Sequence, residues 1–241
     1  MLLRIACRSV PAPCMLRAVR NKAIGISLGP PVQVPVRLAV GLSAMSFHVP
    51  PLPSSTPLRL AAGQSLLIDP HPGASATSLE VLDGVARVFC PCEETGGMTL
   101  AFLQAGDQLR CDRLCSDGVC VEALTQLRFR RSEQTGEGSG FDAVNEWTLQ
   151  LLRIRHLGSA EQRLHALLSL LVRRLGRRCG PWCDLPFRLT HERIGELIGT
   201  TRVTTTRLLS RIRQQQLLDV PSGQSGLRLA PELVESAPLA A

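Results

Sequence analysis

The spacing of hydrophobic residues divides the chain into a strand-forming half followed by a helical half. From Leu58 to about Arg131 the apolar residues occur in short runs, which are separated by turns rich in Gly, Asp and Pro. The runs are Ser65–Ile68, Ser78–Leu82, Ala86–Cys90, Thr99–Leu103 and Val119–Leu127. Many short strands at nearly even spacing are typical of a small antiparallel barrel or jelly roll.

A helical repeat begins after a joint rich in Gly, Ser and Glu at residues 132–140. Val144, Trp147, Leu151 and Ile154 recur at spacings of three and four, which predicts a helix with one apolar seam. Such a seam is the pattern of a helix that pairs with another helix, so we interpret it as a dimer contact. Packing of this helix on its own β-roll is the alternative.

A second helix is predicted directly after the first. Ser159 and Gln162 have the spacing of a capping box, in which both side chains bond to free backbone N–H groups. Gly176 stands where a helix C-cap is expected. The face between them is apolar and consists of Leu164, Leu167, Leu168, Leu171 and Leu175. We therefore expect this helix to be part of the core.

The segment 189–220 has the pattern of a helix-turn-helix. Thr190 is placed to cap a short first helix, and Gly199 supplies the tight turn, where a positive φ favours glycine. Thr200 is expected to cap the second helix, and Gly195 permits close approach of the two helices. The inner faces are Ile194, Leu197 and Ile198 on the first helix, and Leu208, Leu209 and Ile212 on the second.

The exposed face of the second helix carries residues suited to DNA. Its base-reading candidates are Arg202, Val203, Thr206 and Arg207, since arginine pairs with guanine and an apolar side chain meets the thymine methyl. Short polar groups for phosphate contacts are Thr200, Thr201, Thr204 and His191. Two strand-like runs, 217–220 and 227–229, follow and have the pattern of a wing. Double-stranded DNA is therefore the predicted partner.

This order of parts resembles the cyclic AMP receptor/FNR (CRP/FNR) superfamily of bacterial transcription regulators. The segment IGTTRVTTTRLLSRIRQQQLL looks especially like the cyanobacterial members, the global nitrogen regulators among them. The resemblance implies an α+β protein with an N-terminal antiparallel β-roll of the cyclic-nucleotide-binding type, a long dimerisation helix and a C-terminal winged helix-turn-helix. It also implies a cytoplasmic homodimer on a palindromic site, with RNA polymerase as a further partner.

We divide the chain accordingly. Residues 1–57 are expected to be an extension and linker, 58–140 the β-roll, 141–157 the dimerisation helix and 158–232 the DNA-binding domain. The extension is rich in Arg and Pro and contains no acidic residue, as in a transit peptide or a reading frame that truly starts at Met45. Either interpretation predicts that the extension adds little to the fold.

Two features depart from the family pattern. Family members that bind cyclic nucleotide carry a Gly-Glu pair followed by an Arg-Ser/Thr-Ala stretch, whereas this chain reads QLRCDRLCSDGVCVEAL there. A buried phosphate without a counter-charge is costly, so we expect no response to cyclic AMP. The second departure is Thr205, which replaces an apolar core residue and is expected to bond back to the preceding turn at a small cost in stability.

Composition agrees with a DNA-binding protein without establishing one. The net charge is +7 and the pI about 9.3, and all but one of the basic residues are arginine, which a GC-rich genome also explains. No run of about 20 apolar residues is present, so we expect no membrane partner.

The nine cysteines, in a chain without a clear export signal, indicate reduced thiols. Five of them fall in the β-roll, namely Cys90, Cys92, Cys111, Cys115 and Cys120. They are candidates for a metal site or a redox switch, with burial as small apolar residues as the alternative. The pair Cys179 and Cys183 has CxxxC spacing, and we expect it to lie in a loop before the winged helix.

Two rival functions remain. A cupin-type metalloenzyme shares the roll architecture but needs histidine ligands, and no histidine lies between His71 and His156. No catalytic residues are therefore assigned, and no cofactor is required for DNA binding. The second rival is a regulator of the same fold with a degenerate sensor, which binds DNA without any effector.

Overall fold

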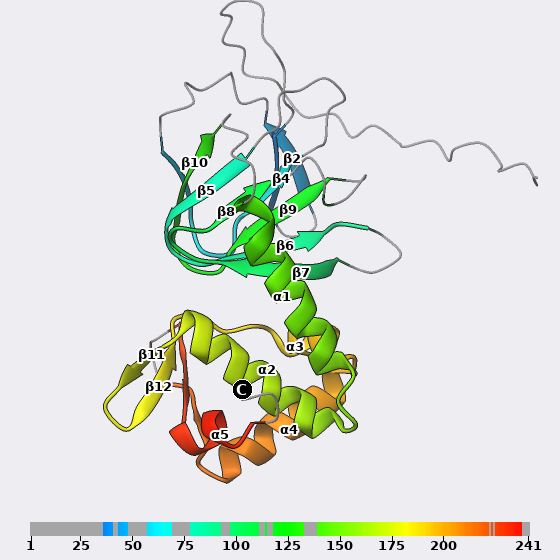
Figure 1. Ribbon diagram of the computed structural model, residues 1–241, viewed down its shortest axis with the longest axis vertical. Helices are drawn as coiled ribbons and strands as arrows, with labels where there is room; N and C mark the ends of the chain where they lie inside the picture. The colour runs from blue at the N-terminus through cyan, green and yellow to red at the C-terminus, as the bar shows by residue number, and fades with distance from the viewer. Residues whose placement is uncertain are drawn as a thin grey trace, which may run out of the picture. The chain divides into compact units, whose positions relative to one another are not determined.

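The computed structural model describes residues 36–40, 43–47, 57–68, 78–92, 97–110, 114, 118–132, 139–221, 223 and 225–237. The chain continues from a β-roll through a long helix into a bundle of shorter helices with a small sheet (Figure 1). None of the described helices is long and apolar enough to span a membrane.

The β-roll consists of two antiparallel sheets. The first contains, in order, β2 (Ser43–Phe47), β1 (Val36–Val40), β4 (Ser65–Ile68), β9 (Val119–Ala123), β6 (Ala86–Cys90) and β7 (Met98–Leu103). The second contains β3 (Leu58–Leu60), β10 (Leu127–Ser132), β5 (Ser78–Asp83) and β8 (Gln108–Arg110). The predicted antiparallel roll is confirmed.

Two strand predictions need correction. The run Val119–Leu127 is one strand in the sequence pattern, but β9 ends at Ala123, because the N–H groups of Leu124 and Thr125 donate to the Val85 carbonyl. The extension was expected to add little to the fold, yet β1 and β2 come from it, and β1 pairs with β4. An unpaired edge of β4 would expose backbone hydrogen-bonding groups, and β1 satisfies them.

Helix α1 (Ser139–Arg155) packs its apolar seam on the roll. Val144, Trp147, Leu151 and Ile154 are all buried within the single chain. The Trp147 ring meets the Phe102 ring of β7 edge to face, with the centroids 5.1 Å apart. The interpretation of these four side chains as a dimer seam is therefore contradicted, because all four are already buried within one chain, and Trp147 packs on the chain's own roll. Both arrangements produce the same helical spacing.

The second half is built on α2 (Ala160–Leu175). The capping box at Ser159 and Gln162 is present, and the predicted leucine face is buried. The remaining elements are β11 (Arg177–Cys179), β12 (Trp182–Leu185), α3 (His191–Ile198), α4 (Arg202–Gln214), β13 (Leu218–Asp219), β14 (Leu227–Leu229) and α5 (Pro231–Glu235).

The segment from Cys179 to Cys183 is a hairpin rather than a loop. Cys179 pairs with Trp182 across the β11–β12 turn, where Gly180 has a φ of 59°. Strand β12 then pairs with β14, so the four strands form one sheet in the order β11-β12-β14-β13. Burial of Cys183 and Leu185 gives this hairpin a place in the core that its turn residues alone do not reveal.

The Trp147 contact predicts a graded loss of stability. Trp147→Ala removes a fully buried ring and should lower the free energy of unfolding by about 3–5 kcal/mol. Trp147→Phe keeps an aromatic ring near Phe102 and should cost less. Urea denaturation measures both, and size-exclusion chromatography should show the wild-type oligomer for each variant. If Trp147→Ala kept the wild-type free energy of unfolding but changed the oligomeric state, Trp147 would instead lie between two chains.

Candidate nucleic-acid interface

The turn between α3 and α4 is fixed by local hydrogen bonds. Thr190 caps α3 by accepting from the Arg193 N–H at 3.2 Å, and Gly199 ends it with a φ of 64°. The Thr200 N–H donates to the Gly195 carbonyl at 2.9 Å and so belongs to the end of α3. The cap of α4 is Thr201, which accepts from the Thr204 N–H at 3.2 Å. The predicted cap, Thr200, is therefore wrong by one residue.

The two helices approach closely at Gly195. A Cβ atom there would lie 2.8 Å from the Thr200 carbonyl oxygen. Facing it is Thr205, whose fully buried hydroxyl donates to the Thr201 carbonyl at 3.0 Å, as expected from the sequence. The predicted inner faces are confirmed in α3 and at Ile212 in α4, while Leu208 and Leu209 are half-buried. The second helix is thus held rigidly on the first.

The outer face of α4 is free to meet a partner. Arg202, Val203, Thr206 and Arg207 are all exposed, and Val203 is 59% exposed, which is unusual for a large apolar side chain. The helix carries four arginines and no acidic residue. Among the described residues, neither Arg202 nor Arg207 makes an ion pair, so both guanidinium groups retain their hydrogen-bonding capacity for a ligand.

The polar candidates gather at the N-terminal ends of the two helices. His191 Nδ1 lies 2.8 Å from the Thr206 hydroxyl, which itself donates to the Arg202 carbonyl. His191 and Thr201 are exposed, whereas Thr200 and Thr204 are half-buried. The structure therefore brings the predicted phosphate and base candidates onto adjoining surface. Helix N-termini carry free N–H groups and partial positive charge, which favour phosphate.

A buried polar network connects α3 with the roll. Arg87 of β6 is fully buried and donates to Glu122 at 2.7 Å, to the Thr99 hydroxyl at 2.8 Å and to the Gly97 carbonyl at 3.1 Å. It also lies 3.5 Å from a carboxylate oxygen of Glu196 on α3. Burial lowers the pKa of Arg87, and the hydrogen bond to Glu122 opposes this shift.

Sequence reasoning missed this network. The only signal is a charged residue, Arg87, at an inner position of the apolar run Ala86–Cys90. A buried guanidinium requires several acceptors, but the sequence does not say where they are.

The cysteine candidates divide. Cys90 and Cys92 form a disulfide, so the expectation of reduced thiols is wrong for this pair. Cys120 is buried in β9, and Cys111 and Cys115 lie outside the described residues. In the described part of the chain no three His, Cys, Asp or Glu side chains are grouped so as to hold a metal ion.

A β-roll, a long connecting helix and a winged helix-turn-helix with an exposed basic helix define a DNA-binding transcription regulator. Residues 58–144 match the model of the cyanobacterial CRP family N-terminal domain, and residues 162–230 match the Crp-like helix-turn-helix domain. The chain is 31% identical over 176 residues to the regulatory protein CysR of Synechococcus elongatus, covering 70% of this chain and 84% of that protein. The chain belongs to the CRP/FNR family of transcription regulators.

Further relatives agree. The global nitrogen regulator of Nostoc is 36% identical over 75 residues, which cover 31% of this chain and 32% of that protein. A CRP/FNR regulator of Thermus thermophilus has the same fold, with a TM-score of 0.57 at 20% identity over 76% of this chain and 100% of its own. FixK2 of Bradyrhizobium japonicum gives 0.56 at 17% identity, over 77% and 98%.

The close approach at Gly195 predicts a large effect for one methyl group. Gly195→Ala should lower the free energy of unfolding by about 1–3 kcal/mol, because the new Cβ meets a backbone carbonyl at 2.8 Å. Gly158→Ala is the matched control, since its nearest atom is the Gln162 side-chain oxygen at 3.7 Å. Thermal denaturation measures both variants. An equal effect of the two substitutions would contradict the close approach.

Proposed function

We propose that this protein binds a palindromic DNA site as a homodimer, with α4 of each subunit in the major groove. The observation that carries the proposal is the exposed face of Arg202, Val203 and Arg207 on a helix held rigidly by α3. In this arrangement the arginines donate to guanine O6 and N7, and Val203 contacts a thymine methyl. Thr206 completes the base-reading face.

Phosphate contacts fix the register of the helix on the duplex. Thr201, Thr204 and His191 supply short polar groups beside the N-termini of α3 and α4, and Thr200 lies between them. We assign residues 158–232 to DNA binding and residues 58–140 to a regulatory roll. Residues 141–157 connect the two and carry the dimer contact.

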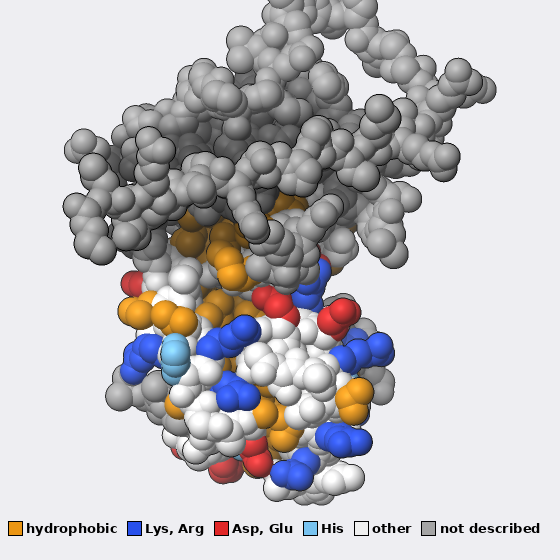
Figure 2. Space-filling view, turned by 90° about the vertical axis from the view of Figure 1, so that its right-hand side faces the viewer, with side chains coloured by type: hydrophobic (Ala, Val, Ile, Leu, Met, Phe, Trp, Pro, Cys, Tyr) orange, Lys and Arg blue, Asp and Glu red, His pale blue; other side chains and the backbone are white. Residues whose placement is uncertain are grey.

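The dimer contact uses the outer face of α1, since the inner face is occupied by the roll. Leu149 and Leu152 are 56% and 54% exposed, and Met98 of the roll is also exposed. Leu152 and Met98 line one groove between α1, β7 and α3, and hydrophobic side chains are visible on this side of the molecule in Figure 2. A second copy of α1 would cover these leucines.

Location, partners and effector are proposed from the family resemblance and from the sequence of the β-roll. We assign the protein to the cytoplasm, with RNA polymerase as a partner on DNA. DNA binding requires no cyclic AMP, since the segment QLRCDRLCSDGVCVEAL, which corresponds to the nucleotide clamp, lacks the Gly-Glu pair and the phosphate-binding arginine of the family pattern. We assign no enzymatic activity, in agreement with relatives that are regulators.

Selection of bound duplexes from a random-sequence library tests the DNA-binding proposal. We expect a palindromic consensus with half-sites about one helical turn apart. Arg202→Ala and Arg207→Ala should each weaken binding to the selected duplex by about 1–3 kcal/mol and relax the preference at one base pair. Arg178→Ala removes the same charge from the β11–β12 hairpin and should leave the preference unchanged. Equal losses on selected and random duplexes would show that neither helix arginine reads a base.

A charge on the outer face of α1 tests the dimer proposal. The double variant Leu149→Glu/Leu152→Glu should be monomeric in light scattering, because it places four like charges in the proposed interface of the dimer. Gln126→Glu adds a charge at an exposed turn of the roll and should remain dimeric. A dimeric double variant would exclude this face of α1 as the contact.

A further inference from the structure

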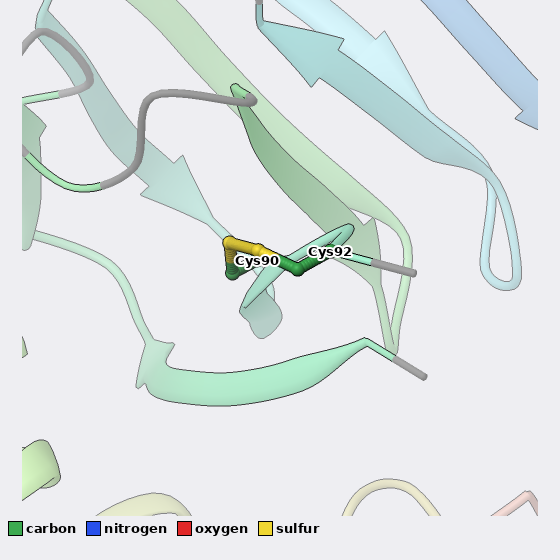
Figure 3. The surroundings of a disulfide bond; sticks show 2 residues. All are labelled: Cys90 and Cys92. Atoms are coloured by element: carbon green, nitrogen blue, oxygen red, sulfur yellow. A yellow bond between two sulfur atoms is a disulfide. The ribbon is translucent and has the colours of Figure 1, made fainter. Parts of the chain in front are cut away.

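A disulfide bond lies at the C-terminal end of strand β6 (Figure 3). It joins Cys90 and Cys92, whose Cα atoms are 5.5 Å apart. Two residues along a regular strand span about 6.6 Å, at roughly 3.3 Å per residue. The Cys-Pro-Cys backbone is therefore bent relative to a straight strand, and β6 ends at Cys90, directly before Pro91, which has no N–H to donate. The disulfide joins the two cysteines across this bend. Cys90 is buried and Cys92 is half-buried, so a reagent in solution reaches Cys92 first.

The disulfide lies one residue pair away from the contact with α3. In the β6–β7 hairpin Cys90 is opposite Met98, and Phe89 is opposite Thr99. The backbone N–H of Thr99 donates to Glu196 Oε1 at 2.8 Å, and its hydroxyl donates to Oε2 at 2.9 Å. Both oxygens of a carboxylate on the helix-turn-helix are thus held by one residue of this hairpin.

The other strand of the hairpin also contacts α3. The Arg193 guanidinium lies over the Phe89 ring, 5.7 Å from its centroid, and Arg87 lies over the same ring at 4.3 Å. Phe89 directly precedes Cys90. A change in the backbone at Cys90 therefore acts on Phe89 and, across the hairpin, on Thr99, both of which contact α3.

We propose that Cys90 and Cys92 form a reversible dithiol–disulfide switch that the β6–β7 hairpin transmits to α3. The proposal rests on the DNA-binding function proposed above and names its regulation. In the oxidation, the Cys92 thiolate attacks a soluble disulfide and releases one thiol. The Cys90 thiolate then displaces the second thiol as the Cys90–Cys92 bond forms. The two protein thiols lose two protons and two electrons, and the soluble disulfide takes up both electrons and both protons.

Reduction releases the covalent constraint between Cys90 and Cys92. Without the bond, the two residues are free to move apart, which changes the backbone at Cys90 and therefore acts on the adjacent pair of Phe89 and Thr99. Hydrogen bonds weaken steeply with distance and angle, so a small shift at Thr99 loosens its hold on Glu196. The contact between the hairpin and α3 then differs between the two redox states, and so does the position of α4, which packs on α3.

The full-length protein is titrated with the duplex selected above, after equilibration with reduced or oxidised glutathione. We expect the two states to differ in DNA affinity by about fivefold or more, which is typical of coupling between two sites. Hydrogen exchange should differ at Thr99 and along α3 without DNA present. Mass spectrometry with a thiol-alkylating reagent verifies that Cys90 and Cys92 interconvert.

Three variants test disulfide formation and its transmission to α3 separately. Cys90→Ser/Cys92→Ser should lose the response and retain the affinity of the reduced state. Cys179→Ser removes an exposed thiol elsewhere and should respond like the wild type. Glu196→Gln keeps an acceptor near Arg87 but has one carbonyl oxygen in place of the two that Thr99 holds, so it should still form the disulfide and show a smaller difference in DNA affinity between its two redox states.

The possible failures are distinguishable. Interconversion of the thiols with the same hydrogen exchange and affinity in both states would overturn the switch. Failure of Cys90 and Cys92 to oxidise would overturn it as well. Absence of specific DNA binding in either state would instead refute the proposed function, while the hydrogen-exchange difference would still report the switch.

Discussion

The buried guanidinium of Arg87 is the constraint on which the arrangement of this protein depends. A charge without access to water must be matched by acceptors. Those of Arg87 are Glu122 of β9, Glu196 of α3, Thr99 of β7 and the Gly97 carbonyl just before β7. The roll and the helix-turn-helix are therefore joined by a polar network, in which Glu196 is shared between Arg87 and Thr99. Loss of an acceptor would leave a buried charge unpaired, which is strongly destabilising.

The two faces of α1 have different tasks. The inner face is part of the core, where Trp147 packs on Phe102, and Phe102 in turn stacks on Phe187. The outer face exposes Leu149 and Leu152. One helix thus contacts the roll on one side and remains available to a second copy on the other. The packing of the inner face fixes the direction of the outer one, so the geometry of the proposed dimer would depend on the core of the single chain.

The proposed redox switch does not need the ligand chemistry of a nucleotide-binding roll. The hairpin of β6 and β7 contacts α3 directly through Thr99 and Phe89, and the disulfide lies at the same end of the hairpin. Only a few residues separate the disulfide from the contact between this hairpin and the helix-turn-helix. This short path joins the cysteines, which the function of α4 leaves unexplained, to the surface that meets DNA.

The sequence by itself determined the local features: strands β4, β5, β6 and β7 of the roll, the capping box at Ser159, the cap at Thr190, the turn at Gly199 and the exposed face of α4. Each depends on residues close together in the chain, whose preferences act before any packing. Only the tertiary structure decided what covers the Trp147 seam, that Cys179–Cys183 is a hairpin, and where Arg87 finds its acceptors. Periodicity shows that one face of a helix or strand is apolar. It does not show which segment packs against that face, because that segment is distant in the sequence.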